Sequence, residues 1–273
     1  ERVIDVGSGH GHLTREIAAS LPKPVLGLER SRSLTERAST LSELENLSFQ
    51  TVDFLGVELE IKPRDCLVGL HACGELGDRI TQYAAKNGAS LALVGCCLQK
   101  QRAATRTPLW PPLEALSLPQ TVLGLSNLSL RAHGVEAIRA DNLAARERRL
   151  ALYWLLREHA GPLKFGAELE GLNRRSAHAE LEVLVELAFA ARRLRCPSQQ
   201  EILDSAARAK QVHGRARRLA LPRTFLARVL ELFVLLDRAR FLCAHDFEVQ
   251  LGELWPAEVS PRNLLLLGTT ART

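Results

Sequence analysis

Short apolar runs alternate with helical patterns along the first 130 positions of this chain. Five runs have the length and apolar content of buried strands, at residues 3–6, 24–29, 47–54, 66–71 and 90–95. The last two are apolar at almost every position, as in strands that helices cover on both faces of a parallel sheet. A helical pattern follows the first strand over residues 13–19. This order indicates an α/β fold with a doubly wound, mostly parallel sheet.

Helical spacing dominates residues 131–240, and Ser198 and Glu201 have the spacing of a capping box that begins one of these helices. Residues 247–252 and 262–268 return to strand-like patterns. We therefore expect three parts: a Rossmann-like core over 1–130, a helical insertion or cap over 131–240, and closing strands over 241–273. The closing strands would complete a seven-stranded sheet, with the insertion between strands five and six.

The composition is that of an ordinary globular protein, with 46% hydrophobic and 25% charged residues. No apolar run reaches the ~18 residues that a membrane span needs, and no signal peptide is visible, so we expect no membrane partner. The chain has no Met and begins inside a predicted strand, so we expect its natural N-terminus, with any targeting signal, to be missing. Its six Cys lack the spacing of a disulfide framework, which favours a reducing, cytoplasmic compartment.

Positive charge is concentrated in the helical part of the chain. Residues 131–240 hold 21 Lys and Arg against 13 Asp and Glu, and no acidic residue occurs from Ser205 to Leu230. The excess gathers in what we call the basic stretch, residues 208–223: Arg208, Lys210, Arg215, Arg217, Arg218 and Arg223. Such a run suits a phosphate-binding surface, with Arg215, Arg217 and Arg218 as the substrate-contacting candidates. The alternative is a solvated helix face. Aromatic residues make up only 5%, so no base-stacking platform is evident.

A glycine-rich turn links the first predicted strand to the first helix. Its pattern is Asp5-x-Gly7-x-Gly9-x-Gly11, and glycines there let the chain turn sharply and let a ligand approach the backbone. A dinucleotide site would need glycine at position 12, which is His12. The pattern resembles the S-adenosylmethionine (SAM) loop of class I methyltransferases. That resemblance implies a cofactor site with five members: Asp5, Gly7, Ser8, Gly9 and Gly11. The alternative is a tight turn with no ligand.

Two acidic residues stand at the ends of the next two predicted strands. Glu29 follows the first glycine by about the ~20 residues at which such folds place a ribose-binding carboxylate. Asp53 ends the third strand, where a methyltransferase reaches the adenine, and Phe54 would lie against the adenine ring. Either acid alone could be a solvated strand end. Together with the glycine turn they favour SAM as the cofactor.

His71, Cys73, Cys96 and Cys97 follow the fourth and fifth strands, so we expect them to converge where the methyl group is presented. His71 and Cys73 are the catalytic candidates, because an imidazole can act as a general base near neutral pH. The alternative for His71 is a ring that only shapes the site. Alternatively, the thiols could be ligands of zinc or of an iron–sulfur centre. Because adjacent residues of an extended chain point to opposite faces, we prefer small apolar packing and expect no metal.

The motifs VIDVGSGHGHL (3–13), VGLHACGEL (68–76) and VGCC (94–97) resemble the methyltransferase-like protein 25 group, also described as ribosomal RNA adenine dimethylase domain-containing proteins. The resemblance returns in LLDRARFL (235–242) and VSPRNLLLLG (259–268), while the middle matches only in being helical. The group usually has Lys at the place of His10 and Tyr-His at the place of Leu98-Gln99. A more distant similarity is to tRNA methyltransferases that carry a His/Cys and a Cys-Cys segment. The resemblance implies a Rossmann-like class I methyltransferase fold and activity.

The residues after the fourth strand bear on the methyl acceptor. Enzymes that methylate an exocyclic adenine nitrogen typically have Asn/Asp-Pro-Pro-aromatic there, whereas this chain has His71-Ala72-Cys73-Gly74. The adenine dimethylase label therefore finds no support in these residues. We predict a SAM-dependent methyltransferase that acts on RNA or a ribonucleoprotein component, with no evident preference for DNA. The alternatives are a protein or small-molecule methyltransferase, or a catalytically silent binding module that retains the SAM fold.

Overall fold

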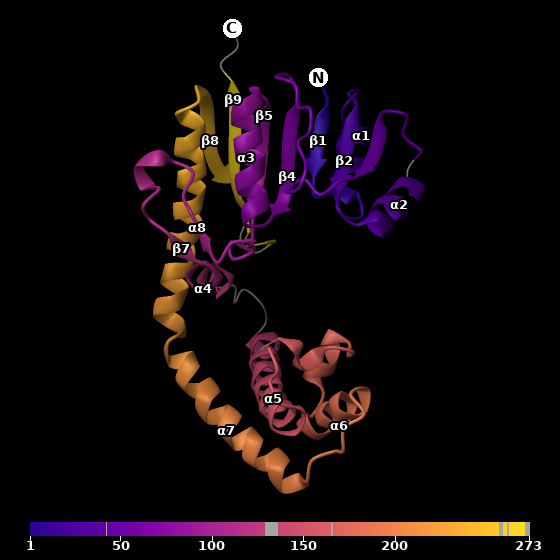
Figure 1. Ribbon diagram of the computed structural model, residues 1–273, viewed down its shortest axis with the longest axis vertical. Coiled ribbons are helices and arrows are strands. Elements are labelled where there is room, and N and C mark those ends of the chain that lie inside the picture. Colours follow the sequence, from indigo (N-terminus) through magenta and orange to yellow (C-terminus); the bar gives the residue numbers. More distant parts are fainter. Residues whose placement is uncertain (42, 129–135, 165, 257–258, 261, 271–273) are drawn as a thin grey trace. The chain divides into compact units, whose positions relative to one another are not determined.

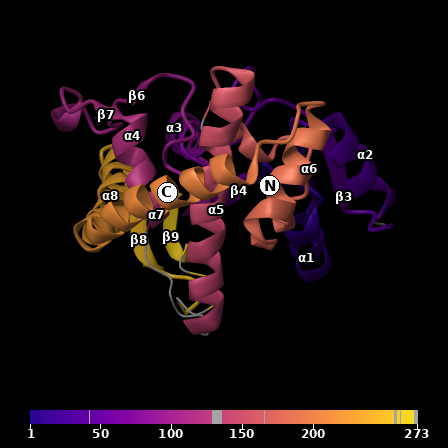
Figure 2. The ribbon, with the colours of Figure 1, turned by 90° about the horizontal axis from the view of Figure 1, so that it is seen from below.

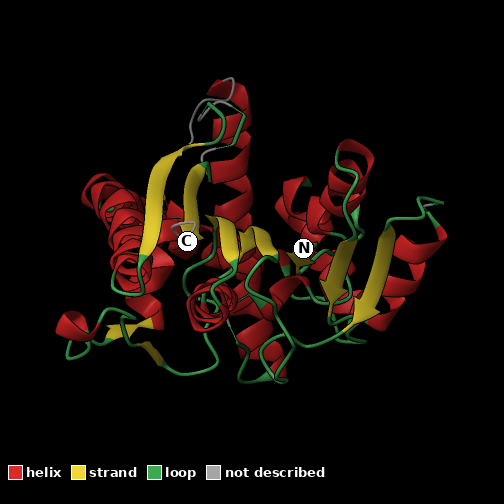
Figure 3. Ribbon diagram, turned by 90° about the horizontal axis from the view of Figure 1, so that it is seen from above, coloured by secondary structure: helices red, strands yellow, loops and turns green. Residues whose placement is uncertain are grey.

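A computed structural model describes the chain except for residues 42, 129–135, 165, 257–258, 261 and 271–273. One seven-stranded sheet has the order β3-β2-β1-β4-β5-β9-β8 (Figures 1 and 3). Its strands are β1 (Val3–Val6), β2 (Val25–Glu29), β3 (Leu47–Thr51), β4 (Cys66–Ala72), β5 (Ser90–Gly95), β8 (Phe247–Glu253) and β9 (Leu264–Thr270). Neighbours among β1 to β5 are parallel, and β9 is antiparallel to both β5 and β8. The expected mostly parallel, Rossmann-like sheet is confirmed.

Consecutive residues of the central strands are apolar and point to opposite sides, so both faces of the sheet are apolar. On one face, α3 (Glu75–Asn87) and α8 (Ala220–Cys243) bury Ile80 and Leu242 against strand residues such as Leu67. On the other face, α1 (His12–Ser20) packs Ala18 against Val3. Helix α2 (Arg32–Thr40) lies beside β2 and β3. The sheet thus holds the carboxyl ends of its parallel strands on a rigid frame.

The segment after β5 is irregular. It contains a small hairpin of β6 (Thr105–Arg106) and β7 (Leu118–Pro119), the short helix α4 (Gln120–Leu123), and the 3-10 turns η1 (Pro111–Leu113) and η2 (Gly124–Leu128). Its buried Leu98 and Leu123 pack against Val234 of α8. Charged side chains anchor the segment as well.

Four charged side chains from three separate parts of the chain meet inside the protein: Asp78, Arg106, Asp237 and Arg238, the buried ion cluster. Arg106 donates to both oxygens of Asp78, at 2.7 and 2.9 Å, and to Asp237 at 2.6 Å. Arg238 donates to Asp78 at 2.8 Å and to the carbonyl of Gly74 at 2.9 Å. Burial alone would raise the pKa of Asp78, but the two guanidinium groups hold it below its usual value. The cluster joins the start of α3, the segment after β5 and α8.

The chain forms two compact units, one of residues 1–130 with 223–273 and one of residues 131–222. The second unit contains α5 (Glu136–Ala160), η3 (Ala167–Leu169), η4 (Arg174–His178), α6 (Leu181–Ala191) and α7 (Gln199–Arg218) (Figure 2). Its core is formed by Leu152, Leu156, Phe189 and their neighbours. The capping box is confirmed: Ser198 accepts from the backbone of Glu201, and Glu201 accepts from that of Ser198.

The expected insertion ended at residue 240, whereas the structure groups 223–240 with the sheet because α8 contributes Leu235 and Ala239 to its core. The division into a cofactor-binding core, a helical cap and closing strands stays a prediction. In the basic stretch, α7 ends at Arg218 and α8 begins at Ala220, so only Leu219 lies between the two helices. Among the described helices, none combines the length and the hydropathy needed to cross a membrane.

Candidate functional site

The glycine loop, residues 7–11, owes its shape to three left-handed residues, with φ of 81° at Gly7, 57° at Gly9 and 73° at Gly11. This conformation costs an L-residue about 1–2 kcal/mol, which explains the glycines. The positions differ in the space around them. A Cβ on Gly11 would lie 2.5 Å from the ring of Phe49, whereas one on Gly9 would meet no atom within 4 Å. Gly11 therefore serves packing, and Gly9 leaves room in front of the loop.

Glu29 fastens this loop to β2. Its carboxylate accepts a hydrogen bond from the backbone of Gly9 at 3.1 Å and another from Ser31 at 2.9 Å. A carboxylate has more lone pairs than these two bonds use, so Glu29 can still accept from a ligand. The sequence predicted its ligand role and not its second role as a brace of the loop.

Asp5 lies behind the loop and is only 3% exposed. Its Oδ2 accepts from the hydroxyl of Thr14 at 2.6 Å. Burial raises the pKa of Asp5 to about 6, against the smaller opposing effect of the Thr14 hydrogen bond. Asp5 thus supports the turn from within.

A pocket of about 470 Å³ opens at the carboxyl ends of the strands. Its size is within the range of cofactor sites, about 300–1,000 Å³. Six of the predicted site residues line it: Gly7, Glu29, Asp53, Phe54, His71 and Cys73. The remaining predicted cofactor residues, Asp5, Ser8, Gly9 and Gly11, do not line its wall. The structure therefore brings the strand-end residues together and leaves most of the glycine loop beside them.

Asp53 follows β3, which ends two residues earlier than predicted, at Thr51. Its Oδ2 accepts from the guanidinium of Arg102 at 2.7 Å. The backbone of Arg102 donates to Glu75 at 2.7 Å, so the segment after β5 is tied to the rim of the pocket twice. Phe54 is nearly buried, and its ring packs 4.9 Å from that of Tyr83. Arg102 and Glu75 were missed by the sequence analysis, because nothing in an irregular segment marks a single Arg or Glu.

His71 sits at an irregular point of the sheet. The register of β4 against β5 shifts between Leu70 and Ala72, and His71 has a φ of 59°, which is rare for a residue with a Cβ. This turn aims its carbonyl oxygen at two thiols, those of Cys73 and Cys96, each with Sγ 3.1 Å away. Its side chain lies in the pocket wall. Strain of this kind persists where the surrounding structure enforces it.

Three sulfur atoms gather at this point: those of Cys73, Cys96 and Cys97, which we call the thiol cluster. They all lie within 4.8 Å of one another, and the Cys73 and Cys96 sulfurs are 2.6 Å apart. A hydrogen bond from Cys96 lowers the pKa of the Cys73 thiol to about 5, aided by the backbone of Cys97 and the charge of Lys100. The same hydrogen bond, with burial, raises the pKa of Cys96. The hydrogen bond between the two sulfurs thus favours ionisation of Cys73 over that of Cys96.

Cys97 has a cationic neighbour as well. Arg262, from the VSPRNLLLLG motif, donates to its sulfur at 3.3 Å. Asn263 is buried and donates to the carbonyl of Trp255 at 2.9 Å, which holds this turn in place. Pro261 lies outside the described residues. The motif at the end of the chain therefore reaches the same point as the two Cys motifs.

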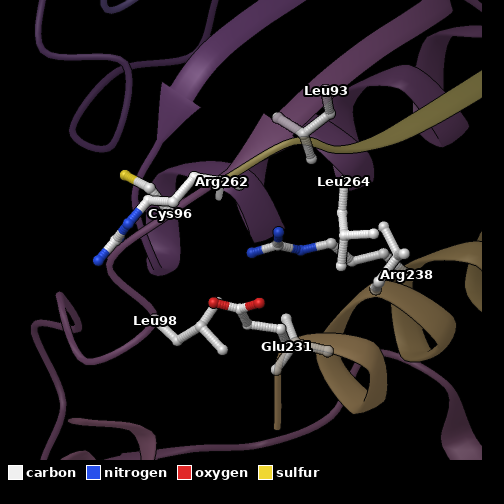
Figure 4. Close-up of a pocket in the computed structure, with 10 residues that line it drawn as sticks. Leu93, Cys96, Leu98, Glu231, Arg238, Arg262 and Leu264 are labelled. Atoms are coloured by element: carbon white, nitrogen blue, oxygen red, sulfur yellow. The ribbon is translucent and has the colours of Figure 1, made fainter. Parts of the chain in front are cut away.

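A second cavity, of about 30 Å³, lies beside Cys96 (Figure 4). In it the guanidinium of Arg238 and the carboxylate of Glu231 point toward the same space. This volume holds about one water molecule, so it is too small for a cofactor. The larger pocket is therefore the candidate ligand site.

A family model described as a methyltransferase domain matches residues 1–104. These residues span β1 to β5, which form the pocket. The part of the chain that forms the pocket is thus similar to a methyltransferase domain. SAM is the cofactor expected for such a domain, and the pocket offers the volume and the Glu29 carboxylate that SAM would need. SAM supplies an electrophilic methyl group on a sulfonium sulfur. Ser8 adds a buried hydroxyl that has no hydrogen-bond partner in the described part of the chain.

Solved structures with a similar arrangement include the YcgJ protein from Bacillus subtilis, at 20% identity over 33% of this chain and 43% of that one, with a TM-score of 0.29. The 23S rRNA methyltransferase ErmE matches at 13% identity over 70% and 88% of the two chains, with a TM-score of 0.29. PKMT2 from Rickettsia typhi matches at 12% identity over 98% and 48%, with a TM-score of 0.31. The chain covers less than half of the first of these proteins. Scores this low carry no argument about the acceptor.

Proposed function

We propose that this protein is a SAM-dependent methyltransferase that transfers the methyl group to RNA or to a component of a ribonucleoprotein, and that it belongs with the methyltransferase-like protein 25 group. The observation that carries the proposal is the basic stretch. Arg215, Arg217 and Arg218 lie at the end of α7, are all exposed, and make no ion pair within the described residues. An uncompensated row of cations is what a phosphate backbone binds.

The rest of α7 shows how these charges are held. The helix packs on α5: Ser205 donates to the carbonyl of Ala151 at 2.8 Å, and the guanidinium of Arg208 lies 3.9 Å from the ring centre of Trp154. Arg208 also pairs with Glu158 at 3.4 Å. Arg208 is therefore partly committed to its own unit, while the three arginines further along face solvent. Of Arg223 the structure describes only the backbone.

For the chemistry, we propose that His71 accepts the proton that the acceptor loses and that Cys73 shapes the place of transfer. Both line the pocket that holds the Glu29 carboxylate. If this assignment is correct, His71→Ala should bind SAM with the affinity of the wild type and lose turnover. Loss of SAM binding in that variant would return His71 to a structural role.

The deciding experiment incubates the chain and tritiated SAM with RNA and with protein extract from the same cells. Label in RNA is the expected result. Label in protein alone, or in small molecules alone, would replace the proposed acceptor. No label with any fraction, together with normal SAM binding, would identify a silent binding module.

The basic stretch is tested separately by RNA binding over a salt series. Each phosphate contact contributes roughly 0.7–0.9 to the log–log slope, so reversing Arg215, Arg217 and Arg218 to Glu should lower both affinity and slope. The matched control reverses Arg37, Lys62 and Arg64, which are exposed in the first unit. Equal effects of the two triple variants would show that only net charge matters.

A further inference from the structure

The thiol cluster is more than a set of small side chains near the cofactor. The expectation of apolar packing rested on the opposite directions of adjacent side chains in an extended chain. However, β5 ends at Gly95, so Cys96 and Cys97 lie beyond the strand, in a turn that Lys100 closes by donating to the carbonyl of Cys97 at 3.1 Å. In this turn both sulfurs come within 4.8 Å of Cys73.

Strand pairing brings the third sulfur to the same place. Ala72, the last residue of β4, is in register with Gly95, the last residue of β5, and Cys73 and Cys96 directly follow them in the chain. Two of the three thiols are therefore fixed by the sheet itself, and the third by the turn after it. Cys96 is buried, and Cys73 and Cys97 are partly buried. A metal ion held by the three sulfurs would therefore be shielded from bulk water on most sides.

Charge around the thiol cluster decides what it holds. Arg262 donates to the Cys97 sulfur at 3.3 Å, so a guanidinium group lies in contact with the cluster. Three thiolates with one divalent ion have a net charge of minus one, which this cation compensates. A disulfide between Cys73 and Cys96 would leave two neutral sulfurs that need no cation.

We propose that Cys73, Cys96 and Cys97 bind one divalent metal ion of the thiolate-preferring class, zinc, at the wall of the cofactor pocket. Zinc takes sulfur ligands at about 2.3 Å, which places neighbouring sulfurs of a tetrahedral site about 3.8 Å apart. The 2.6 Å between the Cys73 and Cys96 sulfurs opens to this value by modest rotation of the two side chains. This inference stands independently of the RNA proposal.

The described residues supply three ligands and no nearby His, Asp or Glu as a fourth. Sites with three protein ligands keep their fourth position for water or a substrate, whereas closed structural sites have four. Because Cys73 lines the cofactor pocket, the open position belongs to the side from which an acceptor would approach. Binding also releases the protons of those thiols that are not yet ionised.

The test measures metal content of the full chain, purified under reducing conditions and loaded with zinc. About one zinc per chain is expected. Cys73→Ser, Cys96→Ser and Cys97→Ser should each lose it, whereas Cys196→Ser and Cys243→Ser, which change exposed cysteines, should retain it. Retention of zinc by all three cluster variants would overturn the proposal.

A second measurement on the unaltered chain covers the case in which those variants fail to fold. Cobalt added to the metal-free protein should give the intense visible bands of a tetrahedral site together with thiolate-to-cobalt charge transfer, and zinc should abolish both. Arg262→Gln should weaken zinc binding by ~10-fold or more, as removal of an outer partner of a ligand does. A cobalt titration that gives no visible absorption bands would overturn the metal site. So would a Cys73–Cys96 disulfide found by mass spectrometry in protein purified under reducing conditions.

Discussion

The carboxylate of Asp237 lies 2.6 Å from the guanidinium of Arg106, although the two residues are 131 positions apart in the chain. Asp237 also accepts from the backbone of Leu109 and of Trp110, at 2.9 Å each. One fully buried carboxylate thus fixes the segment after β5 to α8. Without this carboxylate, the guanidinium of Arg106 and the backbone amides of Leu109 and Trp110 would each lose an acceptor.

Removal of this carboxylate should be costly. In Asp237→Ala the free energy of unfolding should fall by about 3–5 kcal/mol, since buried Arg106 keeps only Asp78 and two partly buried amides lose their acceptor. Urea denaturation at neutral pH measures the change. The matched control is Glu253→Ala, which breaks the exposed pair with Arg228 and should cost about 0–1 kcal/mol. Equal losses in the two variants would contradict the cluster's role.

Two glycines of the loop should respond differently to alanine. Both have positive φ, which costs each variant about 1–2 kcal/mol. Gly11→Ala must also displace the ring of Phe49, for a further ~1–3 kcal/mol, whereas Gly9→Ala meets no atom. Gly9→Val should keep the fold and weaken SAM binding, because its side chain enters the space in front of the loop. Urea denaturation and calorimetric titration separate the two effects, and equal destabilisation by alanine at positions 9 and 11 would refute the packing argument.

Glu29→Gln should weaken SAM binding by ~1–3 kcal/mol, since a charged acceptor of hydrogen bonds becomes neutral. The glutamine side chain is of similar size and can still accept from Gly9, so the loop should stay closed. Calorimetric titration gives the affinity, and Glu36→Gln on the exposed side of α2 is the control. Wild-type affinity in Glu29→Gln would remove Glu29 from the cofactor site.

Asp5 should make the protein's stability depend on pH in an unusual direction. Its pKa of about 6 in the folded state exceeds the model-peptide value of 3.8, so between these values the folded chain holds a proton that the unfolded chain has released. Stability from this group is therefore present below pH ~4 and declines as pH rises to ~6, by about 3 kcal/mol in all. The difference in unfolding free energy between Asp5→Asn and wild type should grow over this range and level off above it. A difference that stays constant with pH would contradict the assignment.

The strands could be predicted because short, almost continuously apolar runs are typical of strands that helices cover on both faces of a sheet. The boundaries of β1 and β5 match the sequence pattern, and those of β2 and β4 differ by one residue. The closing pair was also predictable, since 247–252 and 262–268 alternate or run apolar as strands do. β3 is shorter than expected because Asp53 turns away to meet Arg102.

What the sequence could not reveal depends on contacts between distant positions. The motif LLDRARFL was visible, but nothing local indicates that Asp237 and Arg238 face Asp78 and Arg106. The thiol cluster was hidden for another reason. Cys96 and Cys97 were treated as extended chain, whereas they lie in a turn after β5 that brings both sulfurs close to that of Cys73.

The place of β9 beside β5 has a consequence for how the chain folds during its synthesis. The match to a methyltransferase domain ends at residue 104, yet β5 needs β9, residues Leu264–Thr270, as its neighbour. As the chain leaves the ribosome, Asp78 lacks Arg238, and β5 presents an open edge until residues Leu264–Thr270 have emerged. A nascent chain stalled after residue 130 therefore exposes an unpaired strand and a half-compensated buried charge. Such a chain would be a client for chaperones, although every residue that lines the larger pocket has already been made.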